Sequence, residues 1–227
     1  MHKFLSFFSQ FHRVAFLVSG ILLVIAASSA YQAYTEGDTA QINAEETLGV
    51  FEQLVLKTDE TEPRSITEPL ITIEKIEGDQ EVDVEVEDDP NAEVKKPTYS
   101  PIAKIQIDKI GLSVSVLSEW SYELLDISVN KFSGPEPNEP GNFIVIGHNY
   151  INKAHFGSLK KVEIGDLIKL TDLSGRTLTY EVFEVLIIKP NEVEKLESDN
   201  PIALTLVTCD TNNEYRLVVK SKASESQ

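Results

Sequence analysis

The chain has 227 residues, a single cysteine and a formal net charge of −17. One cysteine excludes an intramolecular disulfide, and a strongly acidic surface repels nucleic-acid phosphates, so we expect no nucleic acid partner. The length fits one ordinary domain with additional segments.

The first predicted element is an uncharged segment over residues 14–34. About 20 apolar residues are enough for a helix to cross a bilayer. Arg13 precedes this segment and Glu36 follows it, which places residues 1–13 in the cytoplasm and the rest of the chain outside. We therefore predict a single-pass transmembrane signal anchor. A cleaved signal peptide is the alternative, because the small residues 28–30 resemble a cleavage site.

Residues 35–98 are predicted to form an acidic extracellular stalk. Between residues 36 and 96 there are 19 acidic and 5 basic residues. High net charge and low hydrophobicity favour an extended, solvated chain. A short helix is plausible over residues 44–56, where Leu48 and Phe51 fall on one face.

The pattern changes at residue 99, where a folded all-β domain is predicted over residues 99–223, before a polar tail at 224–227. Short apolar or alternating runs between turn signals are typical of strands. We expect strands at residues 102–107, 112–117, 143–146, 167–171, 177–188, 203–208 and 216–220. Short helical pieces are expected at 122–127 and 191–196. A closed barrel is the natural way to protect so many strand edges.

Cys209 stands where the apolar run 203–208 gives way to polar residues. A cysteine at a strand end next to a loop is accessible to a substrate. Taken alone, however, a lone cysteine is more often a small buried hydrophobe.

His148 occupies the same kind of position, directly after the apolar run 143–146 and Gly147. We expect Gly147 to let the backbone turn and to place the imidazole at the barrel rim. His155 is the competing histidine, but it lies in a loop-like stretch without a strand to hold it.

Arg216 begins the strand that follows Cys209, seven residues later. If the two strands pair in antiparallel fashion, Cys209 and Arg216 lie close together. A thiolate attacks an amide carbonyl, an imidazole moves the proton, and a guanidinium donor stabilises the oxyanion. The combination of Cys209, His148 and Arg216 at strand ends therefore points to acyl-transfer chemistry.

These residues resemble a known family. Thr205-Leu206-Val207-Thr208-Cys209, followed by Arg216, is similar to the TLxTC and arginine signature of sortases, and Gly147-His148-Asn149 looks like their histidine motif. The resemblance implies a closed eight-stranded sortase-type β-barrel with short helices, following the transmembrane helix and the stalk.

The resemblance also implies a function. Sortases are cysteine transpeptidases that cleave an LPxTG-like sorting signal through a thioester and pass the protein to a cell-wall amine acceptor. Carried over, Cys209 is the nucleophile, His148 the general acid and base, and Arg216 the group that positions substrate and stabilises the oxyanion. Thr208 is a substrate-binding residue. No metal or other cofactor is expected, and the catalytic domain is expected outside the cell membrane.

The class within the family is predicted to be a housekeeping or class D-like anchoring enzyme. Pilin-polymerising sortases carry an Asp-Pro-aromatic lid and a second membrane span, whereas here Asp89-Pro90 precedes Asn91 and residues 221–227 are polar. Three alternatives stay open: a pilin polymerase, another exported cysteine enzyme that hydrolyses its thioester, and a non-catalytic anchored β-domain that binds cell-wall components. L,D-transpeptidases place their cysteine in a Ser-His-Gly-Cys context that is absent from this sequence.

Overall fold

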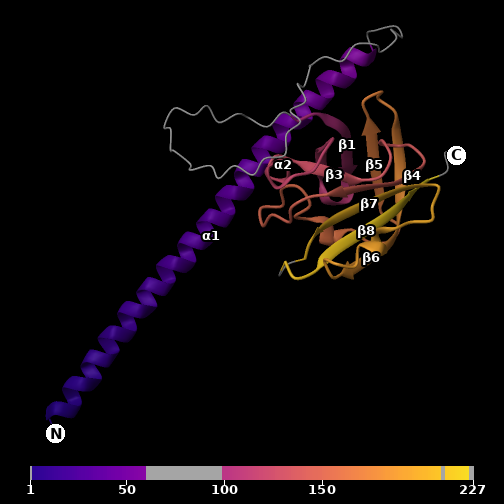
Figure 1. Ribbon diagram of the computed structural model, residues 1–227. Coiled ribbons are helices and arrows are strands. Elements are labelled where there is room, and N and C mark those ends of the chain that lie inside the picture. The colour runs from indigo at the N-terminus through magenta and orange to yellow at the C-terminus, as the bar shows by residue number, and fades with distance from the viewer. Residues whose placement is uncertain (1, 60–98, 211–212, 225–227) are drawn as a thin grey trace, which may run out of the picture.

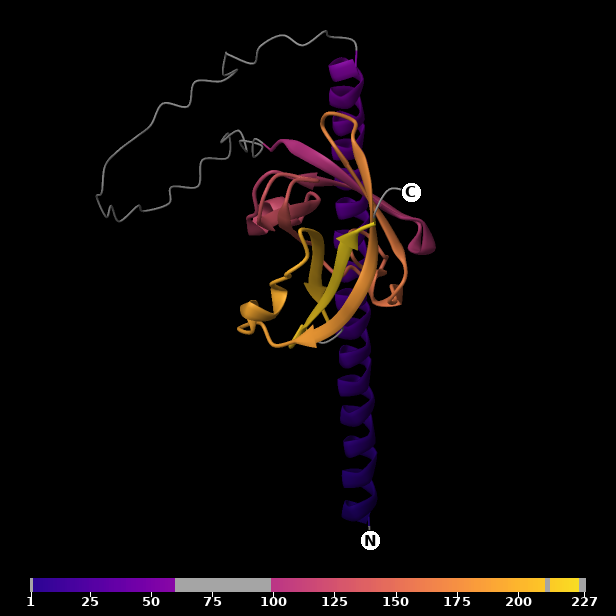
Figure 2. The same ribbon diagram turned by 90° about the vertical axis from the view of Figure 1, so that its right-hand side faces the viewer.

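The computed structural model describes residues 2–59, 99–210 and 213–224, with the side chains of residues 2–21 and 24 outside the described part. One long helix, α1 (His2–Asp59), runs beside a β-barrel, and its N-terminal half projects well beyond the barrel (Figures 1 and 2). Within the described part of the chain, no helix combines the length and the apolar character needed to cross a bilayer.

The domain is the predicted closed eight-stranded barrel. Its strands follow each other around the barrel in the order β1-β2-β3-β4-β7-β8-β6-β5, and β5 pairs with β1 to close it. The strands are β1 (Pro101–Ile107), β2 (Leu112–Leu117), β3 (Val129–Ser133), β4 (Gly141–Ile146), β5 (Leu167–Asp172), β6 (Thr177–Ile188), β7 (Ile202–Cys209) and β8 (Arg216–Ala223). The short helices are η1 (Asp108–Ile110), α2 (Tyr122–Leu125), η2 (Leu159–Lys161) and η3 (Val193–Leu196).

Two strand pairs are parallel, β2 with β3 and β4 with β7, while all other neighbours are antiparallel. The β4–β7 pair aligns Ile146 with Val207, so the residues that follow both strands leave the barrel at the same end. This pairing is the part of the topology that positions the site described below.

The barrel interior is filled by alternating apolar residues from all eight strands. β1 shows the period-2 pattern directly, with Ala103, Ile105 and Ile107 fully buried between half-buried neighbours. A smaller apolar cluster consists of Ile144, Ile188, Leu196, Val207 and Val218, and η3 contributes Leu196 to it.

Helix α1 continues through residues 35–59, so it includes the short helix predicted over residues 44–56 but also residues that were predicted to be an extended stalk. One stripe of this helix packs on the barrel, through Gly37, Ala40, Ala44, Thr47 and Phe51, all of them buried. These residues recur at helical spacing, and the small ones let the helix approach the barrel closely. Their burial offsets the like-charge repulsion that favoured an extended chain. The remaining stalk, residues 60–98, and the tail residues 225–227 lie outside the described residues.

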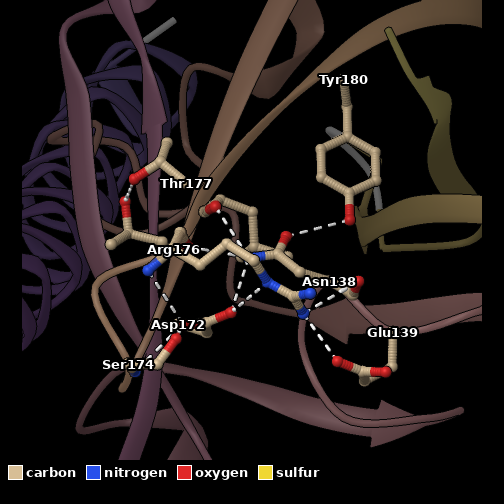
Figure 3. Close-up of polar contacts among 9 residues, drawn as sticks. Asn138, Glu139, Asp172, Ser174, Arg176, Thr177 and Tyr180 are labelled. Carbon is tan, nitrogen blue, oxygen red and sulfur yellow. Dashed lines mark hydrogen bonds and ion pairs between the residues drawn. The ribbon is translucent and has the colours of Figure 1, made fainter. Parts of the chain in front are cut away.

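Polar side chains from the β3–β4 connection, the β5–β6 turn and β6 form a hydrogen-bonded cluster (Figure 3). The buried Asn138 donates to Asp172 Oδ2 at 3.1 Å and to the Leu170 carbonyl at 3.2 Å, and it accepts from the Tyr180 hydroxyl at 3.1 Å. Arg176 donates from Nε to the same Asp172 oxygen at 3.1 Å. Burial raises the pKa of Asp172, but hydrogen bonds from Ser174, Asn138 and Arg176 outweigh it and hold that pKa below its ordinary value.

Candidate active site

Cys209 and Arg216 face each other across the β7–β8 pair. Cys209 is the last residue of β7 and Arg216 the first of β8, and the antiparallel register makes them direct partners. Both are partly exposed. The predicted closeness of these two residues is thus confirmed at the level of the backbone.

The arginine side chain is held by the loop between the two strands. Its Nη1 donates to the carbonyl oxygens of Tyr215 at 3.0 Å and Asn213 at 3.1 Å. Asn213 has a positive φ of 58°, a conformation that asparagine tolerates better than most residues. The loop therefore fixes one edge of the guanidinium beside the strand end that bears Cys209.

Hydrogen bonds connect the cysteine-bearing strand end to the histidine-bearing one. The Thr208 hydroxyl donates to the Gly147 carbonyl at 2.7 Å, and the Asn149 amide donates to the Cys209 carbonyl at 3.0 Å. The Gly147 N–H donates to the Val207 carbonyl at 3.1 Å. The residues on both sides of His148 are thus tied to the residues around Cys209.

Gly147 is required for a different reason from the one the sequence suggested. A Cβ atom at this position would lie 2.7 Å from Val129 Cγ1 and 2.8 Å from Phe156 Cδ2, distances at which something must shift. Its backbone lies outside the region that only glycine favours. The absence of a side chain, and not an unusual turn, lets the chain pass here on its way to His148.

Thr208 is buried, with 3% of its surface exposed. Its hydroxyl is used in the bond to Gly147, which makes the residue a tie between strand ends. The substrate-binding role predicted for Thr208 stays a prediction.

His148 is partly exposed and His155 is buried, which separates the two competing histidines. Burial, and next the charge of His148, lower the pKa of His155 to about 4, while backbone groups of Ala40 and Ile127 act in the opposite direction. Among the described residues, neither ring nitrogen of His155 has a hydrogen-bond partner of good geometry. A buried, neutral imidazole of this kind is poorly suited to proton transfer at neutral pH.

Two further side chains surround His148 that sequence reasoning missed. Asp126, at the end of α2, has Oδ1 3.4 Å from His148 Nε2, and the Tyr150 ring meets the imidazole edge to face at 5.2 Å. Asp126 lies 22 positions before the histidine in a polar stretch, so no local pattern marks it. Tyr150 is close in sequence but is an ordinary loop aromatic without the structure.

A cleft of about 530 Å³ lies beside these two residues, between α1 and the barrel. Its lining residues are Thr35, Glu36, Thr39, Ala40, Asn43, Asp126 and Tyr150. The docked part of α1 therefore forms one wall next to the histidine loop.

Comparison with known proteins agrees with this arrangement. The family model described as the Sortase domain matches residues 105–224. Sortase A of Listeria monocytogenes is 36% identical over 75 residues, which is 33% of this chain and 33% of that protein. A putative sortase of Bacillus subtilis, YwpE, is 34% identical over 89 residues, 38% of this chain and 86% of that protein.

Solved sortase structures are also similar to this chain. The Sortase D5 transpeptidase of Clostridium perfringens has 30% sequence identity and a TM-score of 0.50, over 55% of this chain and 79% of that one. A lid mutant of Sortase A from Corynebacterium diphtheriae shares the fold, with a TM-score of 0.52, 23% identity, and coverage of 59% and 75%. Because the family match covers more than half of the chain and contains both the cysteine and the histidine strand ends, this chain belongs to the sortase family.

Proposed function

We propose that this chain is a cysteine transpeptidase that cleaves an LPxTG-like sorting signal between Thr and Gly and transfers the threonyl group to an amine of a cell-wall precursor. The observation that carries the proposal is the pair of hydrogen bonds from Thr208 to Gly147 and from Asn149 to Cys209. They tie together the two strand ends that bear Cys209 and His148, and Arg216 is the strand partner of the cysteine. Family membership supports the same chemistry.

In this proposal the Cys209 thiolate attacks the Thr carbonyl carbon of the sorting signal. The tetrahedral intermediate collapses when His148 gives a proton to the leaving glycine amine, and a thioester remains on Cys209. The acceptor amine then attacks the thioester, His148 takes the proton of that amine, and the thiolate is released. One bond is broken and one is formed in each half of the reaction.

Arg216 is the proposed oxyanion donor and substrate-positioning group. Its Nη1 bonds to the carbonyls of Tyr215 and Asn213 fix the fork of the guanidinium, and its other nitrogens are the donors that we assign to the substrate carbonyl. Thr208 is assigned a supporting role at the substrate, through the shape that its bond to Gly147 gives this end of β7.

We further propose that residues 14–34 anchor the enzyme in the cell membrane, with residues 1–13 in the cytoplasm and the barrel outside. The uncharged sequence of this segment and the change of charge across it support the assignment. Within the family, the 30% identity to a Sortase D5 supports a class D-like enzyme that anchors proteins to the wall, rather than one that polymerises pilins.

The experiment is peptide cleavage by the full chain in detergent, with an LPxTG-type peptide library and hydroxylamine as the amine. The wild type should convert one or more peptides to the threonyl hydroxamate. Cys209→Ala should abolish this product, and His148→Ala and Arg216→Lys should each lower its rate by at least about a hundredfold, the range for loss of an acid–base or oxyanion group. A folded wild type that is silent towards the whole library would overturn the proposal.

A further inference from the structure

Asp126 joins two residues of the histidine loop through one carboxylate oxygen. Its Oδ1 lies 3.4 Å from Nε2 of His148 and accepts a 3.2 Å hydrogen bond from the Tyr150 hydroxyl. The backbone carbonyl of Asp126 accepts from the Asn43 amide of α1 at 3.4 Å. The carboxylate of Asp126 is therefore in contact with the histidine loop, and its backbone is in contact with the docked helix.

Tyr150 braces both the acid and the imidazole. Its ring lies edge to face with His148, at 5.2 Å and 62°, and with His155 on another side, at 5.2 Å and 75°. Burial first, and then Asp126, raise the pKa of Tyr150 above its ordinary value. The phenol therefore stays protonated and remains a hydrogen-bond donor to the acid.

An acid–base histidine needs a fixed ring orientation and a fixed tautomer. A carboxylate beside Nε2 favours the tautomer that carries its proton on that nitrogen, which leaves Nδ1 as the nitrogen that exchanges protons with the substrate.

The charged and titratable groups around this imidazole come from three elements. Asp126 follows α2, Tyr150 and His155 belong to the loop after β4, and Glu36 of α1 acts on Tyr150. Asp126 is the acid that lies in direct contact with the ring among the described residues.

We propose that Asp126, braced by Tyr150, is the positioning residue of His148: it holds Nε2 and thereby presents Nδ1 to the reaction. The inference rests on the proposed role of His148 in acyl transfer. Asp126 itself acts through the histidine and does not contact the substrate.

The test compares the full-length wild type with Asp126→Ala, Asp126→Asn and Tyr150→Phe. Asp108→Ala is the matched control, because Asp108 is also an exposed acid in an ion pair, 2.9 Å from Lys169, but lies in the β1–β2 turn. Two readouts are measured: kcat and KM for the best library peptide with hydroxylamine, and the imidazole ¹⁵N shifts of His148 at a pH where the ring is neutral. Thermal melts show that each variant is folded.

Asp126→Ala should lower kcat about tenfold, part of the 10²–10⁴ that acid–base catalysis supplies, with KM within about twofold. Its ¹⁵N spectrum should move away from the Nε2–H tautomer. Asp126→Asn keeps a neutral acceptor and should lie between the wild type and Asp126→Ala in both readouts. Tyr150→Phe should lower kcat about threefold, the effect of one lost hydrogen bond on orientation, and Asp108→Ala should match the wild type.

Wild-type kcat in Asp126→Ala, or a lowered kcat with an unchanged tautomer, would overturn the positioning role. Wild-type behaviour of Tyr150→Phe would overturn the bracing by the phenol. The NMR readout needs no turnover. If the wild type cleaves no peptide, the proposed function fails while the tautomer comparison still decides the role of Asp126.

Discussion

His155 should make the protein sensitive to mild acid. This imidazole is 3% exposed, and neither of its nitrogens has a hydrogen-bond partner of good geometry among the described residues, so the folded state disfavours its charged form. Burial, followed by the charge of His148, lowers the pKa of His155 from 6.5 to about 4. Between these two values the unfolded chain binds a proton that the folded chain excludes.

The sign and size of the effect follow from this difference. Because the unfolded state binds more protons, the free energy of unfolding falls as the pH drops from 6.5 to 4, and the loss is complete below that window. A pKa lowered from 6.5 to about 4 corresponds to roughly 3 kcal/mol, since one pKa unit equals about 1.4 kcal/mol.

His155→Phe isolates this contribution, because phenylalanine keeps a flat ring against Tyr150 but does not titrate. Urea unfolding of the full chain, followed by the fluorescence of the single tryptophan, gives the free energy of unfolding at pH 7.5 and pH 4.0. The difference between variant and wild type cancels the titration of other groups. It also cancels any pH-independent cost at the positive φ of 49°. The variant should gain about 3 kcal/mol relative to the wild type on going to pH 4.0, and an equal difference at both pH values would refute the reasoning.

Three further predictions concern packing and hydrogen bonds. Phe51→Ala should lower the free energy of unfolding by about 3–5 kcal/mol, or make α1 susceptible to proteolysis, because Phe51 is 1% exposed. Val50→Ala is the control, and at a position 40% exposed it should leave urea unfolding nearly unchanged. Asn138→Ala should lower the free energy of unfolding by about 2 kcal/mol or more, since it leaves buried partners without hydrogen bonds; an unchanged urea midpoint would contradict the role of this network. Thr208→Val should lower the free energy of unfolding by about 1 kcal/mol and slow peptide cleavage. Thr208→Ser keeps the hydroxyl and should restore both. Equal cleavage rates in the two variants would count against a role for the hydrogen bond from Thr208 to Gly147.

Much of the barrel was predictable because its strands carry their own signals. Alternation of apolar residues and flanking turns marked the strands that correspond to β1, β2 and β4 to β8. β3 was missed because its sequence, Val129–Ser133, contains only two apolar residues. Its buried Asn130 donates from the side-chain amide to the carbonyls of Leu124 and Ser128, while its side-chain oxygen has no hydrogen-bond partner among the described residues. Such a strand is defined by its neighbours, which no local pattern reveals.

The docking of α1 was hidden for a similar reason. Its buried stripe uses Gly37, Ala40, Ala44 and Thr47, residues that give little hydrophobic signal, within a strongly acidic segment. Of the apolar face that the sequence indicated, Phe51 belongs to the buried stripe, whereas Leu48 is only half-buried. The helix is stabilised by its contact with β1 and β2, and the sequence of the segment alone does not contain that contact.

Part of the candidate site could likewise be predicted from the sequence, and part of it could not. Cys209, His148 and Arg216 were identified because each follows or begins a recognisable strand, and the β7–β8 register brings the cysteine and arginine together. Asp126 was not identified, because its relation to His148 depends on the way α2 folds back beside the end of β4. Long-range contacts of this kind need the three-dimensional structure.

The most direct test of the account is mass spectrometry of the intact protein after brief incubation, without added amine, with an uncut sorting-signal peptide that the enzyme is able to cleave. We predict a mass increase equal to the peptide's acyl part up to threonine, located on Cys209, removed by hydroxylamine and absent in Cys209→Ala. Peptide cleavage without such an adduct, or an adduct that persists in Cys209→Ala, would contradict the assignment of Cys209 as the nucleophile.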